Sequence, residues 1–223
     1  TGEQSANAYA NGGNLRSFLF EGLAGLGKTL LMRAVMEAYN VAHQIRIGSK
    51  TPCNQSLFYS SPNELRLNGE EFGTCQNAIA EMRPLILAID EMQDFGNRKT
   101  VQTEKIYGFI KKALDANGYV NGQKHVRFDG ENVYTVSKDT FCCLTATNYP
   151  EKVPDAPAMR SRFQVVPLDP MNSDELTSVL MLMLKARDIR ANELTIARIA
   201  KCGRGTCRPL EKIVDALETR ILA

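Results

Sequence analysis

The residues best suited to chemistry form a glycine-rich segment near the start of the chain, from Gly22 to Thr29. The segment matches the pattern G-x-x-x-x-G-K-[ST] at every fixed position, which predicts a phosphate-binding loop. Its glycines let backbone N–H groups turn toward phosphates, its lysine can reach the terminal phosphates, and its threonine hydroxyl can ligate Mg²⁺. We therefore expect a bound nucleoside triphosphate. The predicted nucleotide-binding residues here are Gly22, Gly25, Leu26, Gly27, Lys28, Thr29 and Leu30.

The segments on either side of this loop fit the same interpretation. Residues 18–20 are a short apolar run typical of a buried strand, and residues 30–36 contain good helix formers. Strand, loop and helix is the order that a phosphate-binding loop requires. We predict that the helix continues to about Tyr39.

A second motif supplies two carboxylates. Five apolar residues, 85–89, precede Asp90 and Glu91, which predicts a strand buried on both faces of a parallel sheet that carries both acids to its carboxyl edge. In this Walker B pattern Asp90 would hold Mg²⁺, and Glu91 would orient and deprotonate the attacking water. The alternative is an acidic turn after a core strand.

A third core strand, residues 141–148, is apolar until its polar end. Asn148 is the candidate to hydrogen-bond the attacking water or the terminal phosphate, and Thr147 is the second candidate. Alternatively, Asn148 caps the turn before Tyr149 and Pro150.

The remaining elements are predicted from periodicity and turn residues. We expect an irregular, flexible lead-in over 1–14, a large α/β nucleotide-binding subdomain over 15–169 and a helical lid over 170–223. Ser173 and Thr206 are the predicted N-caps of two lid helices. Residues 44–47 and 56–59 are predicted strands, and one of them is expected to join the central sheet. A hairpin is predicted over 118–137 around Asp129-Gly130, and an edge strand over 164–168. The predicted helices are 75–82, 104–116, 174–187, 192–201 and 206–221.

Composition gives only general information about partners and cellular location. The chain has 223 residues and a formal net charge of +2, so overall charge gives no argument for nucleic-acid binding. Its six cysteines include no C-x-x-C pair, which favours reduced thiols in a cytoplasmic protein. No apolar run is long enough to cross a bilayer, so we expect an intracellular protein without membrane contact.

Taken in order, these motifs resemble an AAA+ ATPase, and within that family the RuvB-like branch-migration motors. The motifs that carry the resemblance are 25–29, 89–91, 146–148, 156–163 and 204–208. The resemblance implies a P-loop fold with a parallel five-stranded sheet flanked by helices, a small helical lid, and hydrolysis of ATP with Mg²⁺.

The resemblance also assigns roles to single residues. It places Asn148 at sensor 1, Arg162 at the arginine finger and Arg208 at sensor 2, beside the base Glu91. Arg160 is an alternative to Arg162 for the finger. Because a finger acts on the nucleotide of a neighbouring subunit, the resemblance implies a homo-oligomeric ring or spiral, expected to be a hexamer.

Two hypotheses remain for the work that hydrolysis performs. The first is a DNA motor or DNA-loading ATPase, supported by the resemblance and by Lys124, His125 and Arg127 on the hairpin, which in relatives contacts DNA or a partner protein. The alternative is an ATPase that remodels a protein partner, supported by the near-neutral charge and by the lack of a recognisable DNA-binding domain after the lid. Three basic residues on a hairpin can also be simply solvated, and a nucleotide-regulated scaffold is a third alternative.

Overall fold

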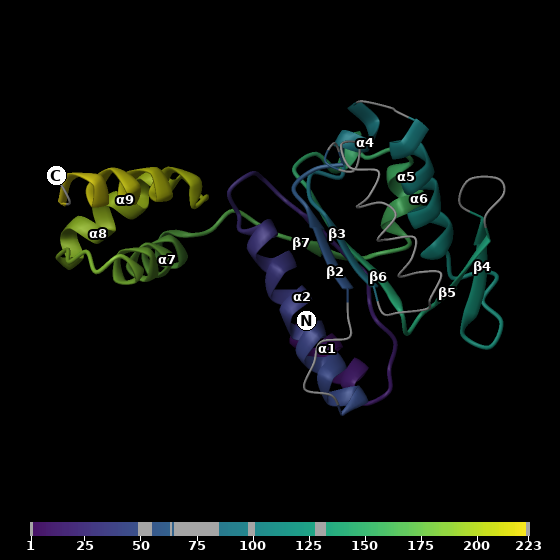
Figure 1. Cartoon of the computed structure of the whole chain (residues 1–223). Helices are drawn as coiled ribbons and strands as arrows, with labels where there is room; N and C mark the ends of the chain where they lie inside the picture. Colours follow the sequence, from purple (N-terminus) through teal and green to yellow (C-terminus); the bar gives the residue numbers. More distant parts are fainter. Residues whose placement is uncertain are drawn as a thin grey trace. The chain divides into compact units, whose positions relative to one another are not determined.

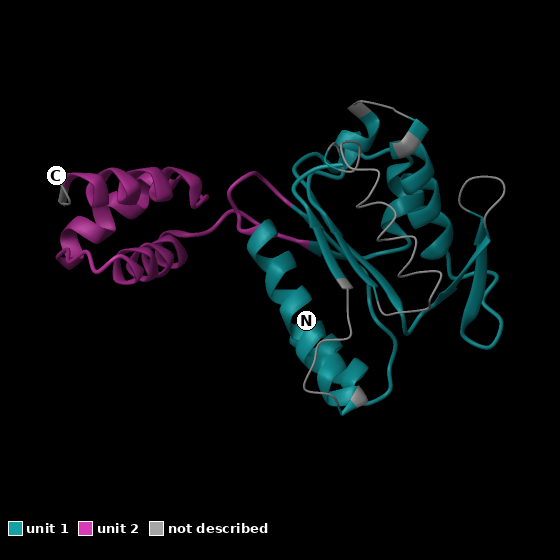
Figure 2. Cartoon of the chain, in the orientation of Figure 1, with its two compact units in different colours: residues 1–21, 29–166 teal, residues 22–28, 167–223 magenta. Residues whose placement is uncertain are grey.

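The computed structural model describes residues 2–48, 55–62, 64, 85–97, 101–127 and 133–221 (Figure 1). The chain forms two compact units (Figure 2). Unit 1 comprises residues 1–21 and 29–166, and unit 2 comprises residues 22–28 and 167–223. We predicted the change from large subdomain to lid between residues 169 and 170, and the second segment of unit 2 begins at residue 167.

The described part of unit 1 is built on a five-stranded sheet in the order β2-β3-β6-β1-β7. Parallel pairing joins β2 to β3, β3 to β6 and β6 to β1. This confirms the predicted fold class, with β7 at the predicted edge. The strands are β1 (Phe18–Glu21), β2 (Gln55–Tyr59), β3 (Leu85–Ile89), β6 (Phe141–Thr147) and β7 (Gln164–Pro167).

The register of these strands sets where their polar ends lie. Ile89 pairs with both Tyr59 and Thr145, and Glu21 pairs with Thr147. Since parallel strands in register end at one edge, the residues after β3 and β6 come together there.

Helices cover both faces of this sheet (Figure 1). Alternate residues of β1 point to opposite faces, as the period of a strand requires. Phe18 and Phe20 line a cavity of about 320 Å³ with residues of α2, whereas Leu19 belongs to the core packed against α5. The helices of unit 1 are α1 (Gly2–Ala10), α2 (Lys28–Ile47), α4 (Asp94–Asn97), α5 (Val101–Ala113), α6 (Ala156–Arg160) and the short 3₁₀ helix η2 (Pro150–Lys152).

Two predictions for the first part of the chain are wrong. Residues 2–10 of the expected irregular lead-in form α1, and α2 continues through the expected strand 44–47. A long-range contact accounts for both, because Tyr9 of α1 packs edge-on against Tyr39 and its hydroxyl lies 2.8 Å from Nδ1 of His43. Packing against a neighbouring element stabilises helix where local pattern is ambiguous.

The hairpin is confirmed as β4 (Gln123–Arg127) paired antiparallel with β5 (Val133–Ser137). Its predicted turn, Asp129-Gly130, and the predicted helix 75–82 lie outside the described residues. Of the basic residues, Lys124 donates hydrogen bonds to the carbonyls of Asp115 and Asn117. This lysine therefore bonds the hairpin to the segment that follows α5.

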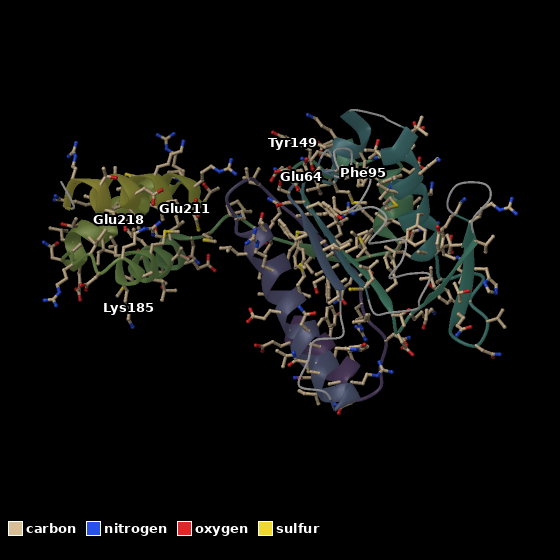
Figure 3. All side chains as sticks on the ribbon, viewed as in Figure 1. Glu64, Phe95, Tyr149, Lys185, Glu211 and Glu218 are labelled. Carbon is tan, nitrogen blue, oxygen red and sulfur yellow. The ribbon has the colours of Figure 1, made fainter. Side chains whose placement is uncertain are left out.

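Unit 2 contains the three predicted lid helices, α7 (Ser173–Ala186), α8 (Glu193–Ala200) and α9 (Arg208–Ile221), with the 3₁₀ helix η3 (Lys201–Gly203) before α9. They bury one apolar cluster, and Arg187 pairs with Asp215 and Glu218 on α9, the latter labelled in Figure 3. The cluster consists of Leu176, Leu180, Leu184, Ile196, Ala200, Leu210 and Val214.

The predictions of Ser173 and Thr206 as N-caps are wrong by one residue each. Asn172, not Ser173, caps α7 in a capping box with Glu175. Since α9 begins at Arg208, Thr206 precedes its first turn, and its hydroxyl donates to the carbonyl of Gly203 instead. A helix long and apolar enough to cross a membrane is not found among the described residues.

Candidate nucleotide-binding and catalytic site

The phosphate-binding loop is the part of unit 2 that precedes α2. Lys28 is buried, and its ammonium donates to the carbonyls of Gly22 at 2.8 Å and Leu23 at 2.7 Å. Leu26 is buried, whereas Leu30, on the first turn of α2, is largely exposed. The ammonium of the predicted loop lysine is therefore held against the backbone of its own loop.

Gly25 brings this loop against the last lid helix. The backbone N–H of Cys207 donates to the Gly25 carbonyl at 2.8 Å. Gly25 has φ +85°, and a Cβ atom placed on it would lie 3.0 Å from Cβ of Arg208. Only glycine fits this approach without strain. Arg208, the predicted sensor 2, is exposed at the start of α9, beside the loop in the same unit.

The two predicted metal ligands contact each other in unit 1. The hydroxyl of Thr29 donates to Oδ2 of Asp90 at 2.5 Å, and Oδ1 of Asp90 accepts from the backbone N–H of Glu91. One hydroxyl and one carboxylate suit Mg²⁺, which takes few protein ligands beside substrate phosphates and water. Within the described residues no group of three or more His, Cys, Asp and Glu side chains could hold a metal without the nucleotide.

The predicted base and the predicted sensor 1 also meet. Nδ2 of Asn148 donates to both carboxylate oxygens of Glu91, at 2.8 Å each. The turn before Pro150 is bonded by Thr147 instead, whose hydroxyl oxygen accepts from the N–H of Tyr149 at 3.1 Å. Tyr149, labelled in Figure 3, lies two residues after the end of β6. The amide of Asn148 thus contacts Glu91, and the N–H of Tyr149 is bonded by Thr147.

The two candidate finger arginines have different surroundings. Arg162 uses all three nitrogens of its guanidinium in hydrogen bonds within the chain. Nε donates to the carbonyl of Lys111 at 2.9 Å, Nη1 donates to that of Ala158, and Nη2 pairs with Asp115 at 2.7 Å. Its side chain is only 17% exposed. The N–H of Asn117 and the guanidinium of Arg162 lower the pKa of Asp115.

Arg160 is more accessible. Its side chain is 51% exposed, and Nη2 lies 3.0 Å from Oε2 of Glu21, the last residue of β1. The other oxygen of Glu21, Oε1, is buried and has no hydrogen-bond partner among the described residues. Burial raises the pKa of Glu21, and the Arg160 charge opposes that shift.

Two residues of this region were missed in the sequence. Gln93 is buried and donates to Glu91, and Glu21 pairs with Arg160. Their positions next to the motifs could have identified them. Glu21 directly precedes the phosphate loop, and Gln93 follows Glu91 by two positions.

A model of the family described as "ATPase family associated with various cellular activities (AAA)" matches residues 18–168. The chain belongs to this family. The match covers both phosphate-loop and Walker B motifs, and it confirms the predicted AAA+ resemblance. Comparison with curated proteins yields no match.

Solved AAA+ structures share the fold. The Holliday junction branch migration motor RuvB of Thermotoga maritima matches with a TM-score of 0.62 and 19% identity, over 96% of this chain and 58% of that one. Domain III of the replication initiation protein DnaA of Thermotoga maritima matches with a TM-score of 0.57 and 14% identity, over 94% of this chain and 78% of that one. The FIGL-1 AAA domain in complex with ADP matches with a TM-score of 0.56 and 18% identity, over 90% of this chain and 59% of that one. The chain thus spans little more than half the length of the RuvB structures.

The contact between the phosphate loop and α9 predicts different costs for two glycine substitutions. Gly25 and Gly27 both have positive φ, but nothing lies within 4 Å of a Cβ placed on Gly27. Each alanine variant should therefore lose about 1–2 kcal/mol of unfolding free energy from backbone strain. Gly25→Ala should lose more, because it must also displace the start of α9. Denaturant unfolding without nucleotide measures both, and equal losses would contradict the contact.

Proposed function

We propose that this chain hydrolyses ATP to ADP and phosphate with Mg²⁺, as a subunit of a homo-oligomer. The observation that supports this best is the pairing of Asn148 with Glu91 next to the bonded pair Thr29 and Asp90. Family membership supports ATPase activity independently of that geometry.

The proposed binding step uses the phosphate loop. Its backbone amides and the Lys28 ammonium would take the β- and γ-phosphates, since amides and a fixed cation suit anionic oxygens. Thr29 and Asp90 would hold Mg²⁺, which, when bound, neutralises the developing charge on the phosphate oxygens.

The proposed chemical step uses Glu91 and Asn148. Glu91 takes a proton from water while the water oxygen bonds to the γ-phosphorus, and the bond to the β–γ bridging oxygen breaks with its electron pair on ADP. Asn148 orients that water through its side-chain amide.

Completion of the site would come from a neighbouring subunit. Of the two arginines, we now favour Arg160 for delivery in trans, because Arg162 would have to give up three hydrogen bonds within its own subunit to extend outward. Arg208 would respond to nucleotide through α9, whose start contacts the loop at Gly25. A ring or spiral, with a hexamer expected, follows from a finger in trans.

Replacing the base should separate binding from turnover. Glu91→Gln keeps the size of the side chain and one acceptor oxygen, but it has no carboxylate to accept the proton. Turnover should fall by about 10²-fold or more, with ATP affinity unchanged. Phosphate release and equilibrium binding of a fluorescent ATP analogue measure the two quantities. Undiminished turnover would remove Glu91 from the role of base.

Single and mixed variants should identify the finger. Alone, Arg160→Ala and Glu91→Gln should each lose most turnover, about 10³-fold for the finger. Mixed, they should regain activity, because some sites then combine an intact Glu91 with a neighbour's intact Arg160. Arg162→Ala should also regain activity in this mixture, because its intact Glu91 can use the intact Arg160 of a neighbour, so Tm separates the two roles. Arg162→Ala should lower Tm more than Arg160→Ala, because Arg162 bonds to Lys111, Ala158 and Asp115 of its own chain. Wild-type turnover in Arg160→Ala together with lost turnover in Arg162→Ala would return the finger to Arg162.

For the work performed, we propose action on DNA, as branch migration, translocation or loading of a DNA-processing partner. The basic hairpin and the fold shared with RuvB and DnaA support this proposal. The alternative, remodelling of a protein partner without DNA contact, is supported by the net charge of only +2 and by Lys124 being bonded within the chain.

The response of the ATPase to DNA distinguishes these two functions. A DNA motor should hydrolyse ATP several-fold faster with duplex or branched DNA, and the gain should weaken steeply with salt, because each phosphate contact releases counterions. His125→Ala combined with Arg127→Ala should reduce the salt dependence. A rate unaffected by every DNA form would favour protein remodelling.

A further inference from the structure

We propose that Gln93 is a positioning residue that fixes Oε2 of Glu91, so that Oε1 is the oxygen that accepts the proton from water. This inference rests on the proposed ATPase function and deepens it. It assigns a role to a residue outside the phosphate-loop and Walker B patterns, and it distinguishes the two oxygens of one carboxylate.

Gln93 joins Glu91 to the end of β6. Its Nε2 donates to Oε2 of Glu91, and its Oε1 accepts from the hydroxyl of Thr147 at 2.6 Å. Gln93 is 4% exposed and Thr147 is 0% exposed. Because both side chains are buried and bonded, the amide of Gln93 is held in one place.

The orientation of that amide follows from the hydrogen bonds around it. The N–H of Tyr149 can only donate, so the Thr147 oxygen accepts from it at 3.1 Å. The carboxylate of Glu91 can only accept, so Gln93 presents its Nε2 to Glu91. The Oε1 of Gln93 therefore faces Thr147, whose hydroxyl donates to it.

The backbone at Glu91 restricts the carboxylate further. Glu91 has φ +54°, a sparsely occupied conformation for a residue other than glycine. It persists because the N–H of Glu91 donates to Oδ1 of Asp90 and the next N–H, of Met92, donates to the carbonyl of Ala146. Both ends of the Glu91 side chain are therefore fixed, the backbone by β3 and β6 and the carboxylate by Gln93.

Asn148 binds the same carboxylate in a different way. Its single Nδ2 lies 2.8 Å from both oxygens, so it favours neither. Asn148 stands at the polar end of β6 and is half-buried, unlike Gln93. If Asn148 turns its amide to the attacking water, Oε1 is freed to accept a proton while Oε2 keeps its bond to Gln93. Such a fixed base keeps the reacting atoms aligned, and a small misplacement costs about 10²-fold in rate.

Four variants of the full chain test this assignment. Gln93→Leu removes both amide bonds at similar size. Thr147→Val removes the hydroxyl that orients Gln93, and Thr147→Ser restores it. Thr145→Val is the matched control, because Thr145 is a buried threonine on the same strand whose hydroxyl donates to the carbonyl of Ile89 at 2.7 Å instead of to Gln93.

Turnover, KM for ATP, equilibrium binding of a fluorescent ATP analogue and Tm are measured for each variant. Gln93→Leu should lower kcat about 10- to 100-fold with analogue affinity unchanged. Thr147→Val should lower kcat less, and Thr147→Ser should recover most of it. Thr145→Val should lower Tm as much as Thr147→Val, while its kcat stays at the wild-type value.

The outcomes separate this inference from the proposed function. A wild-type chain that does not hydrolyse ATP when assembled overturns the proposed function itself. If the wild type hydrolyses ATP and Gln93→Leu keeps its kcat, only the role of Gln93 is overturned. Equal losses of kcat in Thr145→Val and Thr147→Val would likewise assign both threonines to stability alone.

Discussion

The parallel pairing of β3 with β6 is the constraint on which the candidate catalytic centre depends. The register sets Ile89 beside Thr145, so the residues that follow each strand are forced into contact. The N–H of Met92 continues the pairing beyond the strands by donating to the carbonyl of Ala146 at 2.8 Å. A shift of this register by one residue would reverse the faces of every side chain and separate Glu91 from Asn148.

The burial of these strands explains why their polar ends form a bonded network. All seven residues of β6 and all five of β3 are buried. A polar group at such an edge is costly unless it is hydrogen-bonded. Thr145 donates to the carbonyl of Ile89, the last residue of β3, and Thr147 donates to Gln93 in the turn that follows, so both threonine hydroxyls of β6 are hydrogen-bonded. The hydrogen bonds that hold the strand ends together thus also fix Glu91, the proposed base.

The sequence predicted the elements that have a local residue pattern. It did not predict features that depend on contacts with residues far away in the sequence. The phosphate loop, the strand before Asp90 and the lid helices each have a local pattern, and their positions were predicted closely. The extent of α2 was not, because it depends on Tyr9, which is 34 residues from His43. The accessibility of Arg162 depends in the same way on Asp115, 47 residues earlier. Periodicity within a segment contains no information about such partners.

The two arginines near the end of α6 are best understood together. Arg162 donates to the carbonyl of Lys111 in α5 and to that of Ala158 in α6, so it fastens these helices to each other. Met159, which directly precedes Arg160, is fully buried in the core packed against α5. Arg160 is therefore displayed from a segment that is fixed on both sides, and its pairing with Glu21 places it next to the residue that leads into the phosphate loop. An arginine required to reach a neighbour needs such a rigid base, since a mobile segment would lose the precision of its contact. Two arginines at this spacing would then serve one function, with Arg162 as the support and Arg160 as the contact.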